Sequence, residues 1–287
     1  MLDVLVYGVL SGATFAMVAF GFSLVLGVLG IVNMVHGVFV VLGGFATHWL
    51  SSRGWPLPAA VLGATLFTGV AGVLTQKLFI DRVFKTNPLM VLVQTFGLSI
   101  VLVQVMEKTW GASERLLRVD VPGYPMVEMG QVIVPTIEVI IFAIALASTL
   151  MLVLLLNGTN FGRALRACRD NPRNAAILGI NVGNVYMGTM LVCALWTGLA
   201  GALVIGTKPL APYMHLQWTV DAFLIVIIGG LSSVPGVLVA GFLYGALNYM
   251  AFYYASTWAP ALIYGTLIAL LLWRPQGLFG LGAVVRK

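Results

Sequence analysis

The residues best suited to bind another molecule are arginines in the middle of a chain that carries little charge elsewhere. They recur at a spacing of three, which places them on one face of a helix; they are Arg163, Arg166 and Arg169. A guanidinium binds carboxylates and phosphates through a fixed fork of donors. Such a face can simply enforce the topology of the chain and meet the head groups of anionic membrane lipids.

A second, short helix is predicted directly after these arginines. Asn171-Pro172 forms a natural break and cap, so the helix runs from about Arg173 to Leu178 and ends at Gly179. A small, apolar helix between charged residues, outside the membrane, is suited to the groove of a partner protein. Its central residues are Asn174, Ala175, Ala176 and Ile177.

Catalytic and metal-binding patterns are missing from the sequence. His36, His48 and His215 have no metal-ligand spacing, and no acidic residue nearby in sequence completes an acid/base pair. The nearest match to a phosphate-binding loop is the segment 201–208, but its lysine follows threonine where the motif requires Gly-Lys-Ser/Thr. The sequence therefore predicts neither an enzyme nor a nucleotide-binding subunit, and no metal site or cofactor in this chain.

Composition places the elements that carry these residues in a membrane. Of the 287 residues, 60% are hydrophobic and only 8% are charged, far from the averages of soluble domains. No Asp, Glu, Lys or Arg occurs between Asp3 and Arg53 or between Asp221 and Arg274. These intervals exceed the roughly 20 apolar residues that cross a bilayer as a helix. The apolar runs are continuous, which favours helices over the alternating strands of a barrel.

The predicted fold is an all-α, polytopic membrane helical bundle with about 8–10 transmembrane helices, in a single domain over residues 1–287. A compact external loop is expected at about 107–135, because it contains the turn-forming stretch Val121-Pro122-Gly123-Tyr124-Pro125. The expected spans lie near residues 4–27, 35–50, 58–78, 88–106, 136–156, 185–206, 219–231, 236–254 and 259–273.

One expected span, 219–231, is too short to cross a bilayer unaided. It leads into a stretch rich in glycine and proline, which at membrane depth is tolerated only where protein or water covers the backbone. A broken helix that acts as a hinge fits this pattern, and so does a tight turn between two ordinary helices. The residues concerned are Gly229, Gly230, Pro235 and Gly236.

Basic residues predict the orientation of the chain. Ten of the fifteen Lys and Arg residues lie at three places in the sequence. If the chain has nine spans, all three places lie on the same side of the membrane, and the positive-inside rule identifies this side as cytoplasmic. The C-terminus and the coupling segment, the arginine segment at about 162–182, then lie on the cytoplasmic side, where any partner of the segment would bind. Arg53 lies on the outer side. Because these charges sit at span ends, they indicate topology and not binding to nucleic acid.

Few polar residues are expected inside the membrane. Asn33 and His36 share a helix face next to Gly37, and they could line a translocation path or simply bind helices together. Asn248 is a second candidate for the path. Asp221, near a predicted span end, is interpreted as an interfacial charge, since buried charges in membranes are rare.

Four stretches together resemble the permease subunits of branched-chain amino acid ABC importers, and the resemblance covers nearly the whole chain. These importers have two permease subunits, and the chain is similar to the first of them, the high-affinity type. Relatives of this type also move urea, short amides and other small carboxylates. The sequence departs from the family at Asn174, where an acidic residue is usual, and at Ser232, where relatives commonly have Gly. The matching stretches are residues 33–37, 162–180, 229–236 and 274–280.

The resemblance implies a subunit of the bacterial inner membrane that pairs with a second, homologous permease, two cytoplasmic ATPases and a periplasmic or extracellular substrate-binding protein. ATP and Mg²⁺ would bind the ATPases. Branched-chain amino acids are the expected solutes, with urea, amides or aromatic acids as alternatives, and an ion-coupled transporter or a channel as rival classes. The implied ATPase-coupling residues are Arg163, Arg166, Arg169, Arg173, Asn174, Ala175, Ala176 and Gly179.

Overall fold

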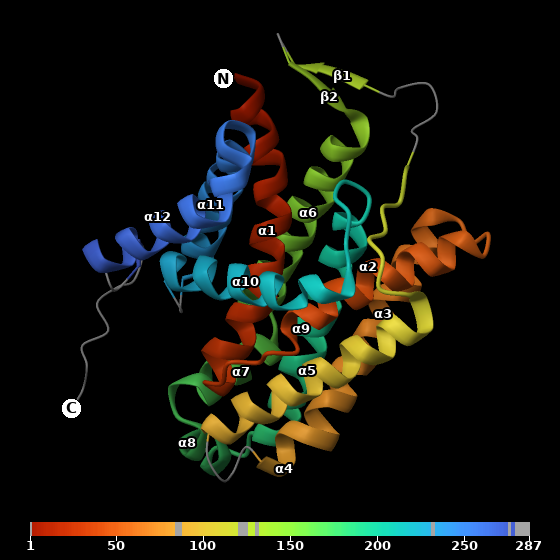
Figure 1. Ribbon diagram of the computed structural model, residues 1–287. Helices are drawn as coiled ribbons and strands as arrows, with labels where there is room; N and C mark the ends of the chain where they lie inside the picture. Colours follow the sequence, from red (N-terminus) through yellow and green to blue (C-terminus); the bar gives the residue numbers. More distant parts are fainter. Residues whose placement is uncertain are drawn as a thin grey trace. The chain divides into compact units, whose positions relative to one another are not determined.

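The computed structural model describes residues 2–83, 88–119, 126–129, 132–230, 233–274 and 277–278. Helices and one small hairpin follow each other along the chain (Figure 1). The elements are α1 (Leu2–Leu29), α2 (His36–Ser52), α3 (Leu57–Thr75), the π-helix η1 (Gln76–Ile80), α4 (Asp81–Val83), α5 (Pro88–Trp110), β1 (Met126–Met129), β2 (Val132–Pro135), α6 (Thr136–Gly158), α7 (Asn160–Asp170), α8 (Pro172–Ile177), α9 (Val182–Val204), η2 (Pro212–Met214), α10 (His215–Gly229), α11 (Val234–Ala255), η3 (Ser256–Trp258) and α12 (Ala259–Trp273).

The helices confirm an all-α, polytopic membrane fold. Most of every expected span is helical within the described residues, but α2 and α10 have only 17 and 15 residues, less than a bilayer crossing requires. The last two expected spans also form one apolar stretch, because η3 joins α11 to α12. Within the described ranges, six stretches are therefore long and apolar enough to cross a membrane: Asp3–Leu29, Leu57–Val83, Leu89–Trp110, Thr136–Gly158, Val182–Val204 and Pro235–Trp273.

The chain forms two compact units, and each unit is assembled from separate stretches of sequence. Unit 1 consists of Met1–Ser23, Val119–Ala147 and Asp221–Lys287. Unit 2 consists of Leu24–Arg118 and Ser148–Val220. The single domain expected over residues 1–287 stays a prediction.

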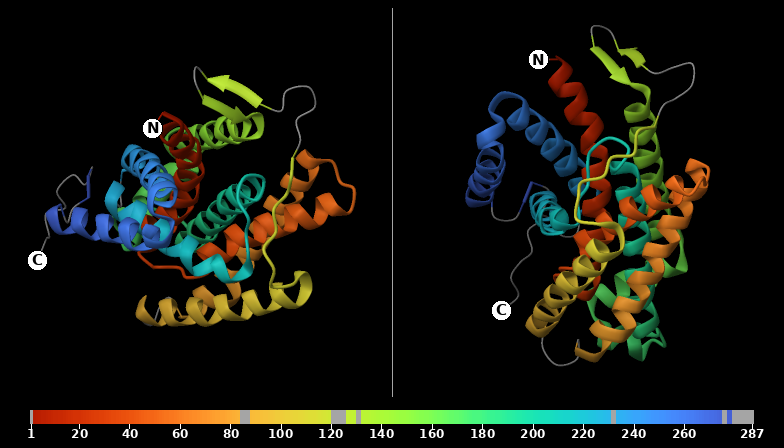
Figure 2. Two further views of the ribbon diagram at one scale, coloured as in Figure 1. Left: turned by 45° about the horizontal axis from the view of Figure 1, so that its top comes forward. Right: turned by 45° about the vertical axis from the view of Figure 1, so that its right-hand side comes forward.

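Three helices of unit 2, α2, α3 and α9, lie side by side (Figures 1 and 2). Glycines on α9 allow the backbones to approach closely. A Cβ atom at Gly198 would lie 2.6 Å from the Cβ of Thr68, and one at Gly201 would overlap the carbonyl oxygen of Val40. Small residues at helix contacts are the usual means of tight packing in membranes, where the hydrophobic effect does not drive helices together.

Unit 1 uses the same kind of contact between α1 and α11. Gly8, Gly12 and Ala16 recur every fourth residue on α1, and Gly241 and Gly245 have the same spacing on α11. A Cβ atom at Gly8 would lie 2.7 Å from the Cα of Ala246, and one at Gly241 would lie 2.6 Å from the Cα of Ala16. The two rows of small residues therefore face each other.

The excursion before α6 contains an antiparallel hairpin that the sequence analysis did not predict. Strands β1 and β2 pair from Met126 opposite Pro135 to Met129 opposite Val132. Val132 and Val134 pack against Leu10 of α1, and the hydroxyl of Tyr7 donates to the carbonyl oxygen of Ile133 at 3.0 Å. The turn-forming stretch 121–125 lies outside the described residues.

Candidate functional site

The arginine segment forms the predicted helix, α7, just after α6. Thr159 caps its first turn by accepting from the backbone N–H of Gly162 at 3.2 Å. Every third residue on one face is buried, and these are Gly162, Leu165 and Cys168. The arginines occupy the neighbouring, exposed face, and these are Arg163, Arg166 and Arg169. The helix is therefore anchored on one face and presents positive charge on the next.

Helix α7 is also fixed to the end of α6. The Nη1 of Arg166 donates to the carbonyl oxygen of Leu156 at 2.6 Å, which satisfies one of the unpaired carbonyls of the last turn of α6. Arg163 donates to the side chain of Asn160. A Cβ atom at Gly162 would overlap the backbone of Leu156, so the two helices meet backbone to backbone. A displacement of α7 must therefore move the end of α6.

The predicted break and second helix are present at the predicted residues. Asn171 ends α7, and its Oδ1 accepts from the backbone N–H groups of Arg173 and Asn174 at 3.0 and 3.1 Å. This cap begins α8, and the chain leaves the helix through Gly179, whose φ of +85° favours glycine. The cap and the glycine thus fix a helix of six residues in length and direction.

Helix α8 exposes apolar side chains. Ile177 and Leu178 are 82% and 78% exposed, whereas Ala175 is buried at 1%. Among the expected coupling residues on this helix, Arg173, Asn174 and Ala176 are exposed, and Ala175 faces its own chain. Exposed aliphatic side chains outside the apolar spans are typical of a surface that another protein covers.

The polar residues expected in a translocation path come together in part. Asn33 is 1% exposed, and its Oδ1 accepts from the backbone N–H of Val35 at 3.0 Å. Its Nδ2 donates to the Sδ of Met190 on α9 at 3.7 Å. His36 is fully buried, and its Nδ1 lies 3.7 Å from the Sγ of Cys193, also on α9.

Gly37 extends this cluster to α10. Its backbone N–H donates to the Oγ1 of Thr219 at 2.9 Å, and that hydroxyl donates to the carbonyl oxygen of His215 at 3.0 Å. A Cβ atom at Gly37 would overlap that same carbonyl oxygen. Asn33, His36 and Gly37 therefore form a buried polar junction of α2, α9 and the start of α10 in unit 2. We call it the unit 2 polar junction.

Asn248 does not belong to the unit 2 polar junction. It lies on α11 in unit 1, where it is hydrogen-bonded to the hydroxyl of Tyr244. That hydroxyl is also hydrogen-bonded to Asp221, whose Oδ1 accepts from the hydroxyl of Tyr264 at 3.0 Å. Asp221 is only 3% exposed, so it is buried within the protein, and its interpretation as an interfacial charge stays a prediction. The spacing of four between Tyr244 and Asn248 was the sequence signal for this cluster.

The glycine- and proline-rich stretch interrupts the helix as expected. Helix α10 ends at Gly229, and Gly230 has a φ of +91°. Ser233 then caps α11 by accepting from the N–H of Gly236 at 3.0 Å, and Pro235 stands in the first turn. A Cβ atom at Gly229 would lie 2.6 Å from the backbone of Gly236, so the two ends are in close contact. Ser232 lies outside the described residues.

Six apolar stretches of crossing length, within the described residues, define a polytopic membrane protein. The family model described as "Branched-chain amino acid transport system / permease component" matches residues 4–272. The chain belongs to this family of transport-system permease components.

Curated relatives cover most of the chain. The high-affinity branched-chain amino acid transport system permease protein LivH of Escherichia coli K12 is 27% identical, over 95% of this chain and 93% of the relative. BraD of Pseudomonas aeruginosa, with the same description, is 26% identical over 97% and 95%. A probable LivH of Methanocaldococcus jannaschii is 24% identical over 89% and 83%. No solved structure matches the chain.

Proposed function

We propose that the chain is the membrane-spanning permease subunit of an ATP-driven importer of branched-chain amino acids. A second, homologous permease, two cytoplasmic ATPases that bind ATP and Mg²⁺, and a substrate-binding protein outside the membrane complete the importer. The observation that carries this proposal is the exposed apolar end of α8, Ile177 and Leu178, on a helix pair that is fixed to α6. Membership of the permease family supports the choice of solute.

Coupling to ATP requires a rigid element whose contacts with the ATPase differ between two conformational states. The reason is that a ligand shifts a conformational equilibrium only by as much as its affinities for the two states differ. Helix α8 inserts into a cleft of an ATPase, and α7 carries its movement. On one side, Arg166 and Gly162 transmit the movement to Leu156 at the end of α6. On the other, the ring of Phe161 lies 2.7 Å from the Cβ position of Gly188 and transmits it to α9.

The movement of α9 then reaches the unit 2 polar junction, since Met190 and Cys193 on α9 contact Asn33 and His36. These two side chains and Gly37 border the path of the solute. Asn248, on α11 in unit 1, remains a separate candidate for contact with the solute. The break between Gly229 and Gly236 serves as a hinge. In this arrangement the C-terminus and α7–α8 face the cytoplasm of a bacterial cell, and the chain lies in the inner membrane.

The test replaces the exposed apolar pair of α8. In the complete importer, the double substitution Ile177→Ser with Leu178→Ser is expected to reduce uptake and substrate-stimulated ATP hydrolysis at least about tenfold. This corresponds to losing roughly 1.4 kcal/mol of coupling. Insertion and thermal stability should change little, because both side chains already face solvent. Asp170→Asn, an equally exposed change in the same segment, is the control and should leave uptake unchanged.

Retention of normal uptake and ATP hydrolysis by the double variant would refute the coupling role of α8. The solute is tested separately, in an importer reconstituted from this chain and its partner subunits. Radiolabelled leucine, isoleucine and valine should accumulate, and urea or a short amide should not. Preferential accumulation of urea or an amide would keep the importer class and replace the solute.

A further inference from the structure

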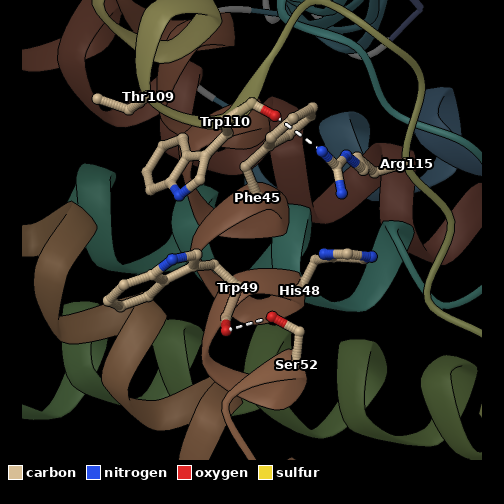
Figure 3. A pocket seen from close by; sticks show the side chains of 7 residues that line it. All are labelled: Phe45, His48, Trp49, Ser52, Thr109, Trp110 and Arg115. Atoms are coloured by element: carbon tan, nitrogen blue, oxygen red, sulfur yellow. Dashed lines mark hydrogen bonds between the residues drawn. The ribbon is translucent and has the colours of Figure 1, made fainter.

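A pocket of about 170 Å³ lies in unit 2 between the C-terminal ends of α2 and α5 (Figure 3). It is slightly larger than the cavity of roughly 150 Å³ that admits a benzene ring in another protein. A molecule with a small aliphatic side chain therefore fits it. The pocket is separate from the unit 2 polar junction, because His48 in the pocket follows His36 by twelve residues, or about 18 Å along α2.

The walls of the pocket have two different characters. In Figure 3 the indole rings of Trp49 and Trp110 lie on one side, and the guanidinium of Arg115 and the imidazole of His48 lie on the other. The ring of Phe45 packs at 6.2 Å from that of Trp110, measured between centroids. The apolar side suits an aliphatic group, and the side with nitrogen atoms suits an anion.

Arg115 is held in place and still has a free donor. Its backbone N–H and carbonyl pair with Leu210, at 2.8 and 2.9 Å, and its Nη2 donates to the carbonyl oxygen of Trp110 at 2.8 Å. Its Nε is buried and has no hydrogen-bond partner in the part of the chain that the structure describes. A guanidinium with one fixed edge and one unused donor is preorganised for a carboxylate.

The helix ends add a second electrostatic feature. The last turns of α2 and α5 place the negative ends of two helix dipoles beside the pocket, where the carbonyl oxygens of Trp49 and Trp110 already accept from Ser52 and Arg115. A ligand with a carboxylate alone would satisfy Arg115 but would also lie near these carbonyls. A zwitterion places its carboxylate at Arg115 and its ammonium group toward the carbonyls.

We propose that this pocket binds a zwitterionic amino acid with a small aliphatic side chain, on its way into the translocation path. The proposal rests on the proposed function, which supplies the solute and places this end of α2 and α5 outside the membrane. Arg115 binds the carboxylate, and Trp49, Trp110 and Phe45 contact the side chain. The interaction is weak and transient, because a permease must also release its solute.

The experiment measures ligand binding to the purified full-length chain by its tryptophan emission, which Trp49 and Trp110 report. L-leucine should give a saturable change. Isoamylamine, which lacks the carboxylate, and inorganic phosphate, which lacks the side chain, should not. Arg115→Gln should weaken leucine binding at least about tenfold, and Arg115→Lys, which keeps the charge but not the fork, by a smaller factor. Arg118→Gln, an exposed change in the same loop, is the matched control.

A second variant guards against misfolding of the Arg115 substitutions. Thr109→Tyr places a ring at the exposed edge of the pocket, leaves Arg115 intact and should also abolish the change in emission. Unchanged leucine binding in Arg115→Gln, or an equal response to phosphate or isoamylamine, would overturn the proposal. Saturable binding that depends on Arg115, in an importer that does not accumulate leucine, would support the pocket and reject the proposed function.

Discussion

At the scale of single residues, the glycine beside the two buried polar side chains determines whether three helices can meet. Gly37 brings the start of α2 against α10, because its N–H donates to Thr219 and its Cα faces the carbonyl oxygen of His215. Their spacing on one helix face singled out Asn33, His36 and Gly37 in the sequence, but it could not predict that Gly37 contacts α10. That contact joins residues 182 positions apart in the sequence, and spacing along one helix reveals only neighbours on that helix.

Gly37→Ala is expected to destabilise unit 2 by roughly 1–3 kcal/mol, since the added methyl group forces α2 and α10 apart. Thermal unfolding in detergent, followed by tryptophan emission, measures the loss. Gly97→Ala is the matched control on α5, where a Cβ atom would meet nothing within 4 Å. That change should be neutral or stabilise the protein by up to about 1 kcal/mol, because alanine favours a helix over glycine. Equal melting temperatures for both variants would contradict the packing of the unit 2 polar junction.

At the scale of elements, hydropathy and turn residues predicted where helices begin and end. The predicted break at Asn171-Pro172 and the end at Gly179 both coincide with caps, because capping depends on local residue types. The hairpin β1–β2 was missed, since strands of four residues give little periodic signal. The cluster around Asp221 was missed as well, because its partners lie on α11 and α12 and meet only after folding.

The contact between α1 and α11 provides a prediction at this scale. Gly12→Leu should destabilise unit 1 by about 1–3 kcal/mol, because the row of small residues on α1 then no longer fits that on α11. A Cβ atom at Gly12 already lies 2.8 Å from the Cα of Phe242. On α12, a Cβ atom at Gly265 would meet nothing within 4 Å, so Gly265→Leu should leave the melting temperature nearly unchanged. A similar loss of stability in the two variants would show that glycine content, and not the contact between α1 and α11, determines the stability of unit 1.

At the scale of the whole molecule, the proposed mechanism requires α7–α8 and the loop after α5 to lie on opposite sides of the membrane. The positive-inside rule gives this arrangement from the arginines on α7, which are all exposed. Both native cysteines, Cys168 and Cys193, are free but buried. Burial also raises the pKa of the Cys168 thiol, so that less of the reactive thiolate is present near neutral pH. The unmodified chain is therefore expected to label slowly and to give a low background.

Single exposed cysteines can then report the side of the membrane. Ser113→Cys, in the loop after α5, should react with a membrane-impermeant maleimide in intact cells. Ala176→Cys, on α8, should react only after the membrane is opened, because the reagent cannot reach the cytoplasm. Background labelling of the native chain should rise only above the ordinary thiol pKa or on unfolding. If Ala176→Cys reacts in intact cells, α8 cannot meet a cytoplasmic ATPase, and force transmission through α7 to α6 and α9 is excluded.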